Sequence, residues 1–219
     1  MFKLEVIYDV NLEPFGYEIL SKNPPTNPWE NWTLSELNKN TIQQLNYILN
    51  HDHDSNVFVN IERQQFFDSS FLSRIEPIIK NLLRKRIHLT FEVTERGGGN
   101  ENDWLLLSEL KQRYKFKLAA DDVMNINDFR KNEIEHGIYD FVKMEPFFLQ
   151  SYSKDSDEVC ERTGEWMKEL LKRFNLEFIA ERIETEKDLC DARDYPFSSF
   201  QGYYFNRTVY RFGQRRLSR

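Results

Sequence analysis

Two adjacent carboxylates, Asp121 and Asp122, follow directly on the apolar run 116–120 (FKLAA). Two neighbouring acids at the end of a buried strand repel each other and lose hydration, so they need positive charge close by. A pair of this kind can give one ligand to each of two metal ions or bridge them. The pair therefore raises the question of which cation balances it.

Further polar residues end other strand-like runs along the chain. One such residue alone is more often structural, because a chain commonly turns polar where it emerges into solvent. Their recurrence at the ends of successive runs instead indicates a shared site. The residues in question are Asn60, Glu92, Lys143, Glu181 and Gln201, together with Glu18 inside the hairpin-like stretch 14–20.

The elements that would position these side chains alternate between strands and helices. The runs 56–61, 87–93, 116–120, 139–143, 176–180 and 198–205 are short, apolar and rich in β-branched or aromatic residues, which predicts strands. The runs 41–49, 71–83, 104–114 and 158–174 have apolar residues three and four apart, which predicts amphipathic helices. Repeated strand–helix units favour an α/β fold with a parallel sheet, and a closed (β/α) barrel is preferred over an open doubly wound sheet. In a barrel, the carboxyl ends of the strands converge on one mouth.

The charges at that mouth indicate its chemistry. Five acids would meet the single cation of Lys143, and they stay ionised only if further cations neutralise them. No His or Cys accompanies them, so the oxygen ligands favour Mg²⁺ or Mn²⁺ over zinc. Two such ions and a lysine suit phosphoryl chemistry on a phosphodiester.

Composition limits the number of domains, the partners and the cellular location that the sequence allows. The 219 residues are enough for a single domain, 1–219, and the net charge of −6 excludes a bulk basic surface for DNA. The basic end 211–219 is interpreted as a solvated tail and the glycines of 97–99 as a plain loop. Neither of the two cysteines has metal-ligand spacing, and no apolar run approaches the roughly 20 residues that span a bilayer. These features predict a cytoplasmic protein that does not enter membranes.

Seven sequence blocks, in order, resemble the EAL domain family of cyclic di-GMP phosphodiesterases, a family of bacterial second-messenger signalling. They are YEIL (17–20), FVNIE (58–62), FEVTER (91–96), LAADD (118–122), FVKME (141–145), IAERIET (179–185) and FQGYYF (200–205). The resemblance extends from about Val6 to Arg207. It implies a TIM-like (β/α)8 barrel of the EAL type whose first strand is antiparallel.

The resemblance also implies a role for each polar residue. The metal ligands would be Glu18, Asn60, Glu92, Asp121 and Glu181, with Asp122 on a second ion. Lys143 would orient and activate the attacking water, in a catalytic group that includes Glu18 and Glu181. Leu20, Lys22 and Gln201 would contact the substrate, whereas Glu95 and Glu184 would support the ligands from behind.

The implied reaction is in-line attack of water on one phosphodiester of cyclic di-GMP, which gives linear pGpG. Two Mg²⁺ or Mn²⁺ ions would support it, and Ca²⁺ would bind without supporting it. The implied partners are cyclic di-GMP, a second copy of the chain in a homodimer and a regulatory protein.

Four departures from the family pattern favour an alternative. The sequence DDVMNIND (121–128) replaces the usual Phe-Gly-Thr-Gly after the Asp pair, and Lys22 replaces an arginine that holds a substrate phosphate. Glu145 stands where the family has Asp, and Arg182 where it has glycine; Arg182 would either crowd the pocket or supply a new phosphate contact. The alternative to the enzyme is an inactive EAL-like module that acts as a cyclic di-GMP receptor or a protein-binding regulator.

Overall fold

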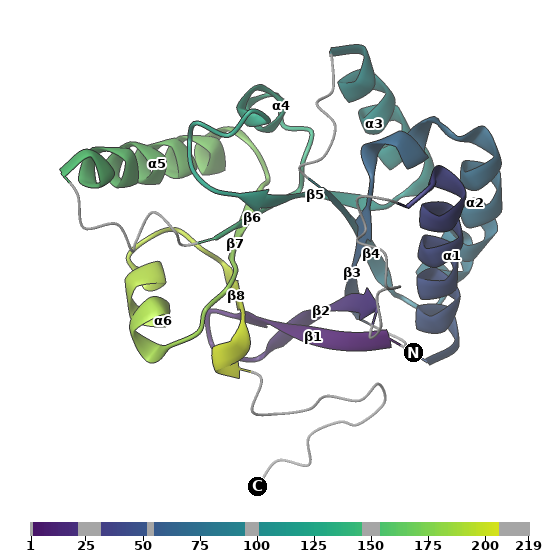
Figure 1. Cartoon of the computed structure of the whole chain (residues 1–219), viewed down its shortest axis with the longest axis horizontal. Coiled ribbons are helices and arrows are strands. Elements are labelled where there is room, and N and C mark those ends of the chain that lie inside the picture. The colour runs from purple at the N-terminus through teal and green to yellow at the C-terminus, as the bar shows by residue number, and fades with distance from the viewer. Residues whose placement is uncertain (1, 22–31, 52–54, 95–100, 146–153, 206–219) are drawn as a thin grey trace, which may run out of the picture.

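Eight strands close into a barrel in the order of the sequence (Figure 1). The computed structural model describes residues 2–21, 32–51, 55–94, 101–145 and 154–205. The strands are β1 (Phe2–Asp9), β2 (Pro14–Ser21), β3 (Asn56–Ile61), β4 (His88–Val93), β5 (Lys117–Val123), β6 (Phe141–Met144), β7 (Glu177–Ala180) and β8 (Ser199–Gln201). The helices are α1 (Leu34–His51), α2 (Ser69–Arg84), α3 (Glu101–Tyr114), α4 (Lys131–Glu135), α5 (Lys154–Arg173) and α6 (Glu186–Arg193), with short 3₁₀ turns η2 (Arg63–Phe67) and η4 (Tyr203–Phe205).

One strand runs against the others. β1 pairs antiparallel with both β2 and β8, whereas every other neighbouring pair from β2 to β8 is parallel. The predicted barrel with an antiparallel first strand is therefore confirmed, and the open doubly wound sheet is excluded. The parallel strands bring their carboxyl ends to one mouth.

An apolar layer fills the barrel below that mouth. Phe58, Ala119, Phe141 and Ile179 meet there with Ile7 of β1. In a strand, residues two apart face the same side. The next inward-facing positions on β3, β5, β6 and β7 are therefore the polar residues Asn60, Asp121, Lys143 and Glu181. The alternation of the strands thus builds a polar layer on an apolar floor.

The second apolar core lies between the sheet and the helices. Outward-facing strand residues such as Val59 and Val142 pack there against helix residues such as Ile75 and Leu170. Figure 1 shows the labelled helices arranged around the outside of the ring, with β1 and β2 on a side where no labelled helix lies. The helices hold the parallel strands in place, and the candidate functional residues lie at the mouth.

Several predicted bounds are corrected by the structure. The strand expected over 198–205 ends at Gln201, because Gly202 turns the chain at φ 151° into η4. The helices expected over 41–49, 104–114 and 158–174 begin earlier, at Leu34, Glu101 and Lys154. The first residues of α3 and α5 are polar and carry no apolar periodicity. The elements η2, α4 and α6 are too short to give such a signal. β1 was not predicted from its own residues, although Phe2, Leu4 and Val6 alternate with Lys3 and Glu5 as in a half-exposed strand.

Some sequence predictions lie outside the described residues. They concern Lys22, Glu95, the glycines of 97–99, and the basic segment 211–219. Among the residues that the structure does describe, no helix is long and apolar enough to cross a bilayer.

Candidate active site at the barrel mouth

Four acids and one lysine meet at the centre of the mouth. Glu18 comes from β2, Glu92 from β4, Asp121 from β5 and Lys143 from β6, while Glu181 follows directly on β7. All five are buried; Glu92 is 0% and Lys143 1% exposed. The structure thus brings these five side chains, which the sequence singled out, together at one place.

The Lys143 ammonium lies within ion-pair distance of each of the four acids. Its Nζ is 2.5 Å from Glu92 Oε1 and 2.8 Å from Glu181 Oε1. It is 3.3 Å from both Glu18 Oε2 and Asp121 Oδ1. Burial alone would lower the pKa of Lys143, but the four carboxylates, Asp121 foremost, hold it well above its usual value. Lys143 is therefore a protonated donor in this arrangement, not a proton acceptor.

Two amides fix the orientation of Glu18. Asn60 Nδ2 donates to Glu18 Oε1 at 2.7 Å, and Gln201 Nε2 donates to Glu18 Oε2 at 2.6 Å. Burial would raise the pKa of Glu18, yet Lys143 and these two amides hold it below its usual value. Because each amide donates through nitrogen, the oxygens of Asn60 and Gln201 remain available as ligands.

The pKa values of the other three acids are shifted upward. Burial raises the pKa of Glu181 to about 8, against the opposing charge of Lys143. Burial also raises the pKa of Asp121, and it raises that of Glu92 well above the usual value, with the charge of Glu18 adding to the effect on Glu92. One ammonium does not neutralise four buried carboxylates.

The donor set fits a hard divalent cation. Glu92 Oε2, Glu181 Oε2 and Gln201 Oε1 are buried oxygens that have no hydrogen-bond partner in the described part of the chain. Within that part, no three acidic, imidazole or thiol side chains form a ready-made metal shell, and the four acids converge on Lys143 instead. Orphaned carboxylate and amide oxygens beside excess negative charge are ligands that Mg²⁺ and Mn²⁺ prefer.

Asp122 reaches the mouth through an irregularity in β5. The β5–β6 register breaks between Ala120 and Val123, and Asp122 has a left-handed φ of 52°. Glu145, the first residue after β6, lies beside it: burial and the charge of Asp122 raise the pKa of Glu145 against the opposing charge of Arg182, whose Nη2 lies 2.6 Å from Glu145 Oε1. Arg182 also has a left-handed φ, 50°, at the position where the family has glycine.

The loop after the Asp pair is held by its own side chains. Asn125 accepts the backbone N–H of Asn127 at 2.8 Å, and Ile126 N–H donates to Thr163 Oγ1 on α5 at 3.4 Å. Arg130 is 0% exposed and binds Asp128 through Nε and Nη2. Arg130 Nη1 also donates to the backbone oxygen at the end of β4, at 3.3 Å. The missing glycines are thus compensated by a buried arginine, which sequence reasoning missed because arginine in a loop is normally exposed.

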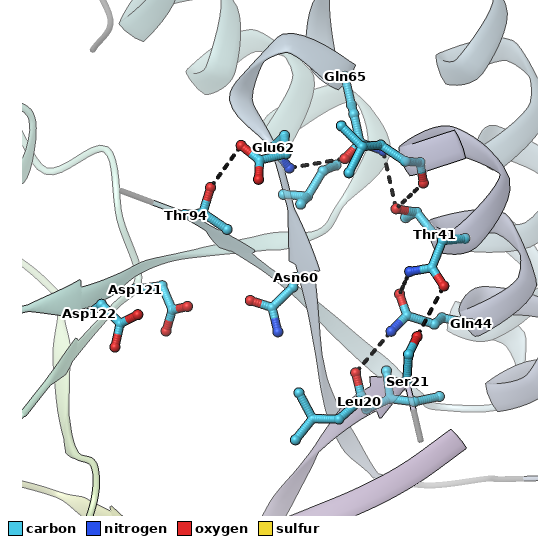
Figure 2. A pocket seen from close by; sticks show the side chains of 14 residues that line it. Leu20, Ser21, Thr41, Gln44, Asn60, Glu62, Gln65, Thr94, Asp121 and Asp122 are labelled. Carbon is cyan, nitrogen blue, oxygen red and sulfur yellow. Dashed lines mark hydrogen bonds between the residues drawn. The ribbon is translucent and has the colours of Figure 1, made fainter. Parts of the chain in front are cut away.

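A pocket of about 220 Å³ adjoins the mouth. Figure 2 shows Asn60, Asp121 and Asp122 along one edge of it and the polar side chains of α1 and β2 along another. Gln44 Nε2 donates to the backbone oxygen of Ile19, and Ser21 Oγ donates to Asn40 Oδ1, so these walls are fixed. The pocket shares Leu20, Asn60 and both aspartates with a hollow of about 430 Å³ over the mouth.

The remaining predicted residues lie at the rim or outside the described chain. Leu20 lines both hollows, as its predicted substrate contact requires. Glu184 is exposed at the rim, and its backbone N–H donates to Asp188 at the start of α6. Lys22 and Glu95 are not among the described residues. The ion pair between Glu145 and Arg182 was missed, because the two residues are far apart in the sequence.

The family model of the EAL domain matches residues 34–208. The chain belongs to the EAL domain family. The match begins after β2, so the placement of Glu18 with the other acids stands on the geometry of the barrel. No protein of curated function matches the sequence.

Solved EAL structures share the fold at low identity. The Bacillus subtilis YkuI protein, in complex with the substrate c-di-GMP and calcium, is 19% identical with a TM-score of 0.73, over 99% of this chain and 56% of that one. The EAL enzyme Bd1971, in a cAMP-bound form, is 18% identical with a TM-score of 0.70, over 95% and 63%. The PaMucR phosphodiesterase, in complex with c-di-GMP, is 18% identical with a TM-score of 0.65, over 95% and 91%. The chain thus spans less than two thirds of the first two structures.

Proposed function

We propose that this protein is a divalent-cation-dependent phosphodiesterase that opens cyclic di-GMP to linear pGpG. The observation that carries the proposal is the cluster at the mouth: four buried acids from four strands around Lys143, with orphaned oxygens beside them. Membership of the EAL family supports the reaction, as do the related structures solved with c-di-GMP. The single-domain organisation over 1–219, the homodimer and the cytoplasmic location stay predictions.

The cation would be held by Glu18, Asn60, Glu92, Asp121 and Glu181. It would supply neutralisation of the phosphodiester and activation of the attacking water. Lys143, kept protonated, would donate a hydrogen bond to that water or to a phosphate oxygen and so align the attack. Gln201 and Asn60 would hold Glu18 in one orientation.

The pocket beside the mouth gives the substrate a place for one base. At about 220 Å³ it is smaller than the roughly 300–1,000 Å³ typical of drug-sized ligands, so it suits a single planar ring system. It opens beside Asp121 and Asp122, and a base bound there would place its neighbouring phosphate over the acids. The amide and hydroxyl groups of Asn40, Gln44 and Ser21 would offer hydrogen bonds to the base edge.

A second function, a cyclic di-GMP receptor without turnover, is favoured by one observation. Arg182 pairs with Glu145, which lies beside Asp122, so the side of the mouth expected to hold a second ion already has a cation. A two-metal mechanism needs both ions to stabilise the attacking and leaving oxygens.

The deciding experiment is hydrolysis of cyclic di-GMP by the purified protein with Mg²⁺, Mn²⁺ or EDTA, with pGpG followed by chromatography. Calorimetric titration with cyclic di-GMP in Ca²⁺ runs beside it. The matched variants are Asp121→Asn and, as an exposed control on α5, Glu161→Gln. We expect cation-dependent pGpG formation that disappears in Asp121→Asn and persists in Glu161→Gln.

Two results would contradict the enzyme. Binding of cyclic di-GMP without pGpG formation would make the protein a receptor. A protein that neither binds nor hydrolyses cyclic di-GMP would overturn both functions. Turnover that survives in Asp121→Asn would remove Asp121 from the set of cation ligands.

A further inference from the structure

Three charged side chains form a row on one side of the mouth. Arg182 Nη2 lies 2.6 Å from Glu145 Oε1, and the Glu145 carboxyl lies close enough to Asp122 for the charge of Asp122 to help burial raise the pKa of Glu145. The Glu145 side chain is 9% exposed and the Arg182 side chain 63%, so the guanidinium lies on the solvent side of the Glu145 carboxyl. The row lies next to the central cluster, because Asp122 follows Asp121 and Arg182 follows Glu181.

The two ends of this row, Asp122 and Arg182, lie at unusual backbone conformations. Asp122 and Arg182 each have a left-handed φ, 52° and 50°, which costs free energy for a residue other than glycine. Glu145 is the first residue after β6, two positions beyond Lys143. The chain accepts two strained residues that bring an aspartate and an arginine to the same carboxylate.

The charge balance differs between the two sides of the mouth. At the centre, four buried acids share one lysine, so negative charge is in excess and oxygens are left without partners. On the Asp122 side, the Glu145 carboxyl lies beside Asp122 and pairs with the guanidinium of Arg182. Two acids this close need a proton or a cation between them, and here the guanidinium of Arg182 supplies a cation that is part of the chain.

We propose that Arg182 takes the place of the second divalent ion, so that the mouth binds one exchangeable divalent cation instead of two. The single ion binds at the central acids, and Arg182 neutralises Asp122 and Glu145. A tethered cation competes at a high effective concentration, so it excludes a second ion unless the guanidinium is removed. This inference rests on the proposed function only in taking the central acids to be a cation site.

The test counts bound Mn²⁺ by calorimetry and by the loss of the free-ion electron paramagnetic resonance signal, with no substrate present. The wild-type protein is compared with Arg182→Asn and Arg182→Lys. Asparagine tolerates the left-handed conformation and removes the charge, whereas lysine keeps the charge. We expect one ion for the wild type and for Arg182→Lys, and two for Arg182→Asn. If Arg182→Asn does not fold, Arg182→Gly replaces it, because glycine adopts this φ without strain.

Any other number of bound Mn²⁺ ions would contradict the inference. Two ions in the wild type would overturn the inference and leave the phosphodiesterase proposal standing. One ion in both the wild type and Arg182→Asn would show that Arg182 does not exclude the second ion, which also overturns it. No bound ion in the wild type would remove the cation dependence itself, so the inference and the proposed function would fail together. The hydrolysis assay with EDTA would distinguish the outcome with no bound ion from the outcomes with one or two bound ions.

Discussion

Glu92 shows how a single residue at this mouth lowers the stability of the folded protein. It is fully buried, one of its oxygens has no hydrogen-bond partner in the described chain, and the charge of Glu18 adds to the burial that raises its pKa. Lys143 is its ion-pair partner at 2.5 Å but is shared with three other acids. Buried charge of this kind is costly until a cation reaches it.

Glu92→Gln should therefore stabilise the cation-free protein and disable the site. Removing one excess charge should increase the free energy of unfolding in EDTA by about 1–2 kcal/mol, which raises Tm by about 2–8 °C. Turnover of cyclic di-GMP should fall on the order of 100-fold or more, a loss similar to that of one preorganised electrostatic contact.

Thermal unfolding in EDTA and pGpG formation in Mn²⁺ measure the two effects, with Glu161→Gln as the exposed control. A Tm that falls in Glu92→Gln would mean that the Lys143 ion pair outweighs the repulsion among the acids.

At the scale of elements, the loop after β5 adopts its path without the family's glycines. No residue of 123–128, all of which the structure describes, has a positive φ. The left-handed turn lies one residue earlier, at Asp122, and Arg130 holds the end of the loop to Asp128 and β4. Glycine is required only where φ is positive or the backbone is approached closely.

Returning a glycine to this loop should therefore bring no gain. Met124→Gly, at a half-exposed position, should change turnover by less than about twofold, as expected for a surface substitution outside any special contact. Steady-state kinetics against Met124→Ala, which controls for the lost side chain, measures the effect. A rise of about tenfold specific to glycine would show instead that the loop limits catalysis.

The strands and the polar residues at their ends could be predicted, because a short apolar run that ends in a polar residue is a local signal that each strand carries by itself. Glu92 and Glu181 were found in this way. The pairing of Arg182 with Glu145 could not be found, since it depends on the left-handed conformation of Arg182 and on the register of β6 with β7. The burial of Arg130 was hidden for a similar reason: its partners are the backbone of another strand and a loop aspartate.

At the scale of the whole molecule, the acids of the mouth come from strands all around the barrel. Glu18, Glu92, Asp121 and Glu181 belong to or directly follow β2, β4, β5 and β7. A cation bound by all four contacts elements that unfolding would separate, so binding should be linked to global stability.

Mn²⁺ at about 100 times its dissociation constant should stabilise the protein by about 2.7 kcal/mol. For a chain of this size the increase in Tm is about 5–11 °C. Differential scanning calorimetry across a Mn²⁺ series measures it, with Asp121→Asn as the variant in which the increase should vanish. An equal increase in both proteins would point to binding elsewhere on the acidic surface.

The antiparallel strand β1 has a consequence for the order in which this protein folds. Ile7 pairs with Gln201, so the ring closes only when the two ends of the described chain meet. Such a contact is among the most non-local in the described part of the chain and forms late, as the loss of chain entropy on closing so long a loop precedes any gain from the contact. Gln201 also donates to Glu18, so the same closing step completes the mouth. During synthesis, a partly made chain would hold most of the acids but not the arranged site, and cation binding would begin only when the barrel is whole.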